Sequence, residues 1–343
     1  MAFDFYSDNT AAVHPKIMAA IAAANEGYAT PYGADELSSR LNRVYSELFE
    51  HETYVFPVSS GTAANGLAIG SAMPPYGTVF CHEAAHIVVA EGGSVEFYSG
   101  GGRLVLLGGE SCKLAAPTIE RALAGYGPSF IQQLHASALT LTQATERGTL
   151  YSLDEIRALA DAAKRGGLKV HMDGARFANA LVALGTTPAG MTWKAGVDIV
   201  SFGTTKNGTM MAEAVLVFDK ALAEVVRFKH KRAGFLHSKM RYFSAQLLAY
   251  VEDGLWLDNA RKSNATARRL ADAFTATPGV GLLHPVETNQ IFVDLPPEVV
   301  KRIDAADLKF RAWPDPKGRQ HRLVASYMDA ADLVRRVENA LGR

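Results

Sequence analysis

Leu168-Lys-Val-His-Met-Asp173-Gly-Ala-Arg176 is an apolar run that ends in an acid and is followed at once by glycine. A second run, Val197-Asp-Ile-Val-Ser-Phe-Gly-Thr-Thr-Lys206-Asn-Gly208, passes from apolar residues into small polar residues and one lysine. Both patterns are typical of short buried strands that end in a polar turn. Because similar strands alternate along the chain with helical patterns, the sequence predicts an α/β fold with a mostly parallel sheet flanked by helices.

The same patterns give the expected elements and domains. Strands are predicted at residues 53–58, 78–81, 104–107, 138–142, 168–172, 198–202 and 214–218, and helices at 15–25, 63–72, 117–124, 153–164 and 177–184. After residue 250 we expect a helix at 255–276, strands at 291–295 and 322–326, and a last helix from about residue 330. This division predicts a large domain at 31–250 and a smaller α+β domain at 251–343, with the segment 1–30 packing with the small domain.

Composition narrows the class of protein. The 343 residues are 48% hydrophobic and 20% charged, which is ordinary for a globular protein. Lys and Arg number 35 and so do Asp and Glu, so charge gives no case for nucleic acid or a membrane surface. The basic cluster at 227–232 is typical of a solvated helix face. No apolar stretch approaches the roughly 20 residues that span a bilayer, and the start does not resemble a signal peptide. Because Cys81 and Cys112 form no disulfide framework, a cytoplasmic location is expected.

The acid at residue 173 has two interpretations. Side chains alternate along a strand, so His171 and Asp173 project to one face while Val170 and Met172 project to the other. Ligands of open α/β sheets bind at the carboxyl ends of the strands, where Asp173 is expected. Taken alone, Asp173 fits a cap of the following helix. The functional interpretation is a carboxylate that keeps a cofactor's pyridinium nitrogen protonated.

Lys206 is unusual for a lysine, because most lysines are surface charges. It follows one apolar strand directly and precedes another at 214–218. Its backbone is therefore expected near the interior, where an unpaired ammonium is costly. A lysine in this position needs either a partner or a lowered pKa, and a lowered pKa is what Schiff-base chemistry uses.

Two further motifs precede these strands in the chain. Val58-Ser-Ser-Gly61-Thr62-Ala-Ala-Asn65 predicts a helix N-terminus that suits either a phosphate or a simple Ser/Thr cap. His82-Glu-Ala-Ala-His86 matches the HExxH zinc pattern, but His82 falls at a strand end and no third ligand is evident. We therefore expect no metal, and His86 is interpreted as stacking on a flat cofactor. The alternative is a pair of histidines satisfied by backbone groups.

Taken in order, the motifs resemble a known family. Tyr32-Gly-Ala-Asp35, Ser60-Gly-Thr-Ala-Ala-Asn65, His86, His171-Met-Asp-Gly-Ala-Arg176 and Thr205-Lys206-Asn-Gly look like those of the low-specificity L-threonine aldolases. These are fold-type-I enzymes that depend on pyridoxal 5'-phosphate (PLP), within the β-eliminating lyase group. The resemblance continues through residues 192–198, 238–241 and 251–256, so it covers nearly the whole chain.

The resemblance implies roles for single residues. Lys206 would form the Schiff base with PLP, Asp173 would contact the pyridine nitrogen, and His86 would stack on the ring. Gly61 and Thr62 would hold the phosphate, and His171 would belong to the same cofactor site. The positions that would bind the substrate carboxylate are Ser7, Arg176 and Arg322. Family members are commonly homotetramers built as a dimer of dimers, in which Tyr32 and a basic residue near 231–241 would reach a neighbouring subunit's site.

The implied activity is cleavage of L-threonine, L-allo-threonine and other β-hydroxy-α-amino acids to glycine and an aldehyde. His86, or a water near it or His171, is the candidate base for the β-hydroxyl. Many family members carry a histidine in the loop at 142–146, but this chain does not, which leaves the threo/allo preference open. Alternatives are β-elimination or racemisation on the same scaffold, a nucleotide-binding module using the helix at Gly61, and a metal-binding protein using His82 and His86.

Overall fold

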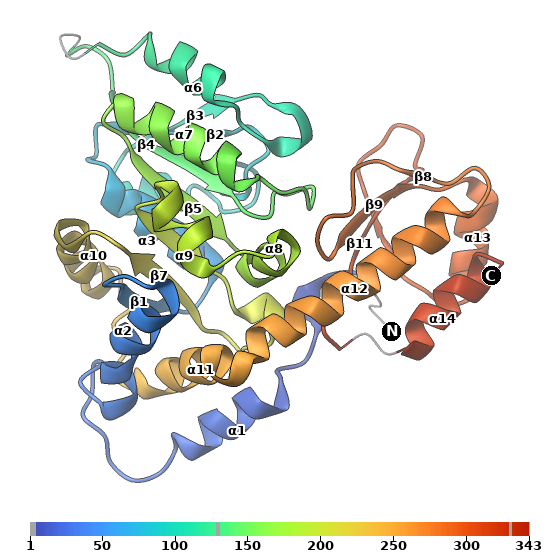
Figure 1. The fold of residues 1–343 in the computed structure, drawn as a ribbon, viewed down its shortest axis with the longest axis horizontal. Helices are drawn as coiled ribbons and strands as arrows, with labels where there is room; N and C mark the ends of the chain where they lie inside the picture. The colour runs from blue at the N-terminus through green and yellow to red at the C-terminus, as the bar shows by residue number, and fades with distance from the viewer. Residues whose placement is uncertain (1–4, 128–130, 329–330, 343) are drawn as a thin grey trace.

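A seven-stranded sheet forms the centre of the large domain (Figure 1). The computed structural model describes residues 5–127, 131–328 and 331–342. Its strands are β1 (Tyr54–Val58), β2 (Gly77–His82), β3 (Arg103–Leu107), β4 (His135–Thr142), β5 (Lys169–Gly174), β6 (Ile199–Phe202) and β7 (Glu213–Val217). The order is β1-β7-β6-β5-β4-β2-β3, and only β7 runs antiparallel to its neighbours β1 and β6. The predicted mostly parallel sheet is confirmed, although β4 begins three residues before its predicted start.

Helices cover both faces of this sheet. They are α1 (Pro15–Ala23), α2 (Glu36–Phe49), α3 (Gly61–Ala72), α4 (His86–Val89), α5 (Ser94–Ser99), α6 (Ala116–Leu123), α7 (Leu153–Arg165), α8 (Phe177–Leu184), α9 (Pro188–Met191), α10 (Lys220–Arg232) and α11 (Arg241–Val251). The small residues of α3 pack with α10 on one face, against Ile199, Val215 and Val217. Helices α2, α7, α8 and α11 cover the other face, where Val170 and Met172 point as their alternation predicts.

The C-terminal part carries a second sheet and its own core. Strands β8 (Gly281–Leu282), β9 (Gln290–Asp294), β10 (Arg311–Ala312) and β11 (Gln320–Val324) pair antiparallel in the order β10-β11-β9-β8. Helices α12 (Leu255–Thr275), α13 (Pro297–Ala305) and α14 (Ala331–Ala340) pack on it. The two-residue strands β8 and β10 are exposed and have no apolar alternation, so the sequence does not reveal them. The predicted start of the last helix at residue 330 lies outside the described residues.

Helix α12 joins the two parts of the molecule (Figure 1). Its first turns, with Trp256 and Ala260, belong to the large core, whereas Leu270 and Phe274 belong to the small core. The N-terminal segment also contacts both parts: Phe5 accepts a hydrogen bond from Val324 at 2.8 Å, while α1 packs on α11. The limits at residues 30 and 250 therefore stay predictions, because packing changes inside α12 and inside the first 25 residues.

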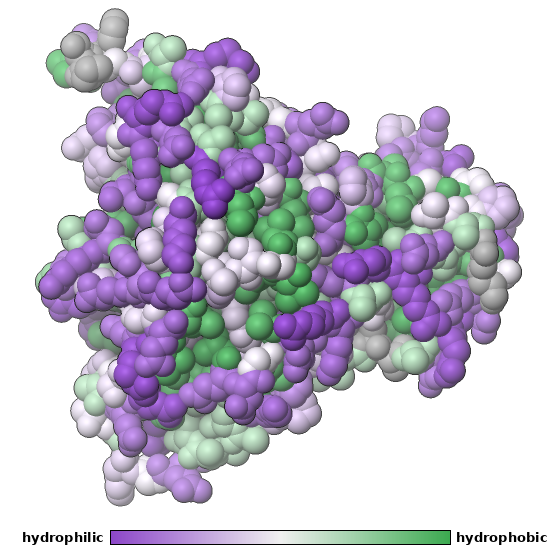
Figure 2. Space-filling model, viewed as in Figure 1, coloured by the Kyte–Doolittle hydropathy of each residue, from purple (hydrophilic) through white to green (hydrophobic). Residues whose placement is uncertain are grey.

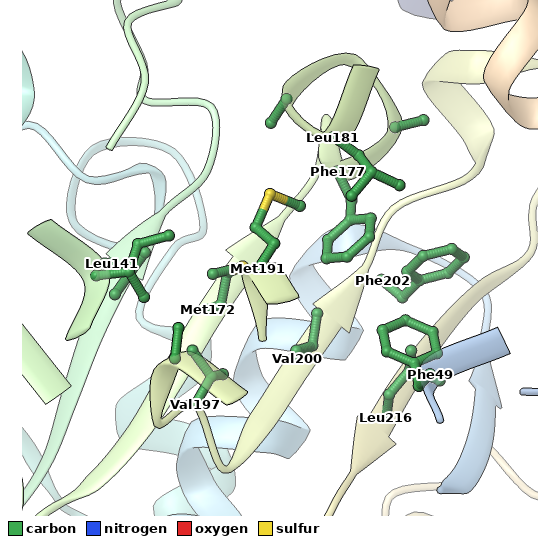
Figure 3. Packing of buried hydrophobic residues seen from close by; sticks show 14 of the residues in the cluster. Phe49, Leu141, Met172, Phe177, Leu181, Met191, Val197, Val200, Phe202 and Leu216 are labelled. Carbon is green, nitrogen blue, oxygen red and sulfur yellow. The ribbon is translucent and has the colours of Figure 1, made fainter. Parts of the chain in front are cut away.

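Aromatic side chains fill the large core beside the end of β6. Phe202 packs edge-on to Tyr45 with ring centroids 5.7 Å apart, and Phe177 and Trp256 contact the same ring. Figure 3 shows Phe49, Phe177 and Phe202 gathered beside the strands that carry Met172 and Val200. The visible surface is mainly hydrophilic, with hydrophobic side chains near α8 (Figure 2). In the part of the chain that is described, no helix has the length and apolarity needed to cross a membrane.

We expect Phe49→Ala to lower the free energy of unfolding by about 3–5 kcal/mol, because it leaves a cavity in a close-packed core. Phe49 is fully buried and contacts the rings of Tyr45, Phe177, Phe202 and Phe218. Urea unfolding followed by circular dichroism measures the change. The control is Ile131→Ala, a side chain that is 91% exposed and should change stability by about 0.5 kcal/mol or less. Equal effects of the two substitutions would contradict this packing.

Candidate active site

The register of two parallel strands brings the two predicted key residues to one edge of the sheet. In the β5–β6 ladder Asp173 lies opposite Ser201, and Gly174 lies opposite Phe202. The chain then turns at Gly203, where a Cβ atom would come within 2.6 Å of the Ala175 Cα atom. Only glycine fits this close approach, which leads the chain directly to Lys206.

A cavity of about 240 Å³ opens at this edge. Gly61, Thr62, His86, Asp173 and Lys206 all line it, so the structure brings together five of the predicted site residues. Other lining residues come from the N-terminal segment, the α3 region and the sheet edge: Asn9, Ser59, Ser60, Ala64, Asn65, Glu91, Ala175, Ser201, Phe202, Gly203, Thr205 and Glu213.

Lys206 stands on a short 3-10 turn that is held at both ends. The backbone amide of Thr204 donates to Glu213 Oε2 at 2.6 Å, and the Asn207 side chain donates to the Tyr250 hydroxyl and the Trp256 carbonyl, both at 2.8 Å. Burial, and then the nearby positive charge of Arg176, lower the pKa of Lys206. A lysine with a lowered pKa supplies more of the neutral amine, which is the nucleophile.

Asp173 is buried, and both of its carboxylate oxygens accept hydrogen bonds. Oδ1 accepts from the backbone amide of Ala175 at 3.0 Å, and Oδ2 accepts from Asn65 Nδ2 at 2.9 Å. The bond to Ala175 closes a turn before α8, whose N-cap is Arg176 and has no side-chain cap hydrogen bond. The interpretation of Asp173 as a helix cap is therefore wrong, and its carboxylate lies in the cavity wall.

The N-terminus of α3 offers free backbone donors to the cavity. Ser60 caps the helix, because its hydroxyl accepts from Ala63 and its carbonyl accepts from Ala64. In the described chain the preceding amides of Gly61 and Thr62 have no such partner, as expected for the first turn of a helix. A Cβ atom at Gly61 would meet nothing within 4 Å, so space for an anion lies beside these amides.

His171 is fully buried and is not among the residues that line the cavity. Its Nδ1 is 2.8 Å from Thr140 Oγ1 and its Nε2 is 2.9 Å from Ser201 Oγ, so both ring nitrogens are engaged. Burial lowers the pKa of His171 to about 4, which keeps the ring neutral near pH 7. His171 thus ties β5 to β4 and β6 within the sheet that carries Asp173.

The two histidines of the HExxH string have separate surroundings. His82 ends β2, where its Nδ1 accepts from the Ala84 amide and its Nε2 lies 3.0 Å from the Gly109 carbonyl. His86 begins α4 and lies 2.8 Å from Glu91 through Nδ1. Among the described residues, no group of three or more His, Cys, Asp or Glu side chains is placed to hold a metal ion.

The residues assigned to the substrate carboxylate lie close together but outside the cavity wall. Arg176 binds Asp8 through two hydrogen bonds, Nε to Oδ2 at 2.8 Å and Nη2 to Oδ1 at 2.9 Å. Arg322 has a buried Nε without a partner in the described chain, and burial, then Arg176, lower its pKa to about 10. Ser7 caps the turn at Asp8 by accepting from the Asn9 amide at 3.2 Å. Arg176 is thus already paired, while Arg322 keeps a free donor.

Tyr32 lies away from the cavity in this single chain. Its ring is half exposed and faces Lys231, whose Nζ is 4.5 Å from the ring centroid. Lys231 belongs to the basic cluster, of which other members are also engaged: Arg227 pairs with Glu224, and buried His230 bonds to the Pro57 carbonyl. Most of the cluster lies in the last turn of α10, where positive charge interacts favourably with the helix dipole.

Sequence reasoning missed several polar residues of this site. Glu91 and Glu213 line the cavity, and Asp8 pairs with Arg176. Glu213 had a usable signal, because it is an acid at the start of the otherwise apolar run Glu213-Ala-Val-Leu-Val217. Asp8 and Glu91 carried no sequence signal, except that they lie close in the chain to Ser7 and His86.

Comparisons with known proteins agree with this geometry. The low specificity L-threonine aldolase of Pseudomonas aeruginosa is 40% identical over 334 residues, which cover 96% of this chain and 94% of the relative. That of a Pseudomonas species is 41% identical over 294 residues, covering 85% and 84%. The solved threonine aldolase of Leishmania major superposes with a TM-score of 0.92 at 27% identity, covering 100% of this chain and 99% of the other. The model of the beta-eliminating lyase family matches residues 4–297, and the chain belongs to this family.

Proposed function

We propose that this chain is a PLP-dependent aldehyde-lyase that cleaves L-threonine, L-allo-threonine and other β-hydroxy-α-amino acids to glycine and an aldehyde. The observation that carries the proposal is the meeting of Lys206 and Asp173 at one cavity, beside the free amides of α3. The relatives from Pseudomonas that match most of the chain are named low specificity L-threonine aldolases, which supports this choice of substrate.

PLP is the cofactor of this family, and the residues present suit it. A phosphate needs several donors and little steric bulk, which Gly61, Thr62 and the α3 amides supply. An aldehyde needs an amine with a lowered pKa, which Lys206 supplies. A pyridine ring needs an acid at its nitrogen and a flat side chain on its face, roles that we assign to Asp173 and His86. Thr205 lines the same cavity and adds a polar side chain to its wall.

When bound, the cofactor accepts the electron pair that is left on Cα as the Cα–Cβ bond breaks. The chain's own residues decide which bond breaks, because only the bond perpendicular to the ring can do so. Asp173 would lie at the ring nitrogen of the bound cofactor, where a carboxylate would favour the protonated ring. His171 is neutral and both of its ring nitrogens have partners, so we assign it the role of supporting the strand that carries Asp173. We assign His86 as the base that accepts the proton of the β-hydroxyl.

We infer that Arg322 provides the main grip on the substrate carboxylate. Its free Nε and its lowered pKa fit a guanidinium that awaits an anionic partner. Arg176, with Ser7 beside the Asp8 turn, would add its remaining donors, since two of them already bind Asp8.

We expect Arg322→Gln to raise KM for threonine at least about 100-fold, because it removes a charge-assisted pair worth about 3 kcal/mol. Steady-state kinetics measure this, and an unchanged KM would refute the assignment.

We also propose a homo-oligomer, a dimer of dimers with shared active sites. Phe97 of α5 and Phe228 of α10 are 77% and 67% exposed, and α5 and α10 border one groove. Large exposed hydrophobic side chains of this kind mark interaction surfaces. Tyr32, half exposed and outside its own cavity, is assigned to a neighbouring subunit's site. A cytoplasmic location is proposed because both cysteines are buried and unpaired.

Aldehyde release tests the reaction. We expect the purified protein with PLP to form glycine and an aldehyde from L-threonine, L-allo-threonine and β-phenylserine. β-Elimination would instead release ammonia and an oxo acid, and racemisation would give the D-enantiomer without an aldehyde. Product analysis by chromatography separates the three outcomes. Glycine formation from none of the three substrates would refute the aldolase assignment.

The cofactor linkage has its own test. We expect the wild-type protein with PLP to show a visible absorbance band that Lys206→Ala lacks, because among the described residues Lys206 is the one lysine that lines the cavity. Absorption spectra recorded at equal protein and cofactor concentrations measure the difference. Lys169→Ala, on the far end of β5, is the matched control and should keep the band. An unchanged band in Lys206→Ala would refute the assignment of this lysine.

The loop at 142–146 contributes a buried acid to the site region. Glu146 Oε1 accepts from the His86 amide at 3.0 Å and from Thr142 Oγ1 at 2.9 Å, while Oε2 is buried without a partner in the described chain. Burial raises the pKa of Glu146 from 4.5 to about 7. Between these two values the folded chain holds the proton more tightly than the unfolded chain, so stability falls as pH rises.

We therefore expect Glu146→Gln to reduce this decline between pH 5 and pH 8 by up to about 3 kcal/mol. Urea unfolding at both pH values, for both proteins, measures it. The lowered pKa of His171 acts in the opposite direction below pH 6.5, but His171 is present in both proteins and cancels in the comparison. The same decline in wild type and variant would show that Glu146 is not the group responsible.

A further inference from the structure

Four side chains from separate parts of the chain form one continuous hydrogen-bonded path. His86 Nδ1 lies 2.8 Å from Glu91 Oε1, and Asn65 Nδ2 donates to the same oxygen at 2.8 Å. Asn65 Nδ2 also donates to Asp173 Oδ2 at 2.9 Å. The path therefore connects the histidine assigned to the face of the ring with the acid assigned to its nitrogen.

The surroundings of Glu91 determine its hydrogen-bonding role. Its side chain is fully buried and receives donors from Asn65 and from the Ser94 hydroxyl, which is 3.1 Å from Oε2. A carboxylate that receives such donors acts as an acceptor only. His86 must then donate from Nδ1, and the neutral ring carries its lone pair on Nε2. Glu91 thus selects one tautomer of His86.

Asn65 has one possible orientation in this path. Its amide lies between the carboxylates of Glu91 and Asp173, so the NH2 group donates one hydrogen to each. The flipped amide would place its oxygen against two negative charges. Asn65 is 2% exposed, and its amide lies between the two acids and donates a hydrogen bond to each in a poorly solvated site. This arrangement fixes Glu91 before any ligand arrives.

We propose that Glu91 is a positioning residue that holds His86 with Nε2 ready to accept the proton of the substrate's β-hydroxyl, and that Asn65 locks Glu91 in place. In this step the O–H bond breaks and an N–H bond forms at Nε2. The oxygen's electron pair forms the C=O bond of the aldehyde as the Cα–Cβ bond breaks, and the Cα–Cβ electron pair passes to the cofactor. The inference rests on the proposed function.

Glu91→Leu tests the proposal because it removes the acceptor for His86 Nδ1 and keeps a side chain of similar size. Without that acceptor the neutral imidazole reverts to its usual tautomer, with the proton on Nε2. In the holoenzyme with ¹⁵N-labelled histidine, assigned with a His86→Gln spectrum, we expect wild type to show a protonated Nδ1 and the variant a protonated Nε2. We expect kcat for β-phenylserine cleavage to fall on the order of 10²–10⁴-fold, the usual contribution of a positioned base.

A partial reaction separates this role from a general loss of structure. Exchange of the α-hydrogen of glycine breaks no β-hydroxyl O–H bond, so Glu91→Leu should leave its rate within about threefold of wild type. Glu91→Asp keeps the carboxylate and should retain the wild-type tautomer and at least about a tenth of the cleavage rate. Glu83→Gln, which removes the charge of an exposed acid in the preceding loop, is the control and should stay within about threefold.

The outcomes distinguish two failures. If wild type releases no aldehyde, the proposed function is wrong. If wild type is an aldolase but Glu91→Leu keeps its tautomer or its cleavage rate, the role of Glu91 is wrong. Loss of glycine exchange and cleavage together in both Glu91→Leu and Glu91→Asp would also overturn the proposal, because it would indicate a purely structural residue.

Discussion

The parallel pairing of β5 with β6 is the constraint on which the site depends. It sets Asp173 opposite Ser201 and sends the next residues of both strands over the same edge of the sheet. The close approach of Gly203 to Ala175 fixes where the β6 chain turns, and the aromatic core around Phe202 holds the end of that strand. A shift of one residue would turn Asp173 into the core and Met172 toward the ligand. Lys206 and Asp173 therefore meet only in this register.

Around that edge the molecule buries several charges, and it stabilises each acid with donors. Asp173 has Asn65 and an amide, Glu91 has Asn65 and Ser94, and Glu213 has the Thr204 amide. Buried acids without such donors would be costly and would take up protons. The cations differ, because Lys206 has a lowered pKa and Arg322 keeps a buried free donor. Acids with donors, a lysine with a lowered pKa and an arginine with a free buried donor suit an anionic, aldehyde-bearing ligand.

Local patterns in the sequence predicted the sheet and the key pair well. Val170 and Met172 alternate with His171 and Asp173, so the strand and its faces follow from side-chain periodicity. Lys206 follows from its place between two apolar runs. The pair of Asp8 and Arg176 did not follow, because 168 residues separate its members and only the tertiary fold joins them. Glu91 was missed for a related reason: its contact with Asn65 crosses 26 residues, and no periodic pattern marks an acid that packs into a site.

We propose that Lys206 bonds covalently to the cofactor. The most direct measurement is borohydride reduction of the protein with PLP, followed by proteolysis and mass spectrometry of the lysine-containing peptides. Reduction makes the linkage permanent, so the modified residue can be located. We expect a pyridoxyl group on the peptide that carries Lys206 and on no other lysine in stoichiometric amount. A pyridoxyl group on another lysine, or on none, would contradict it.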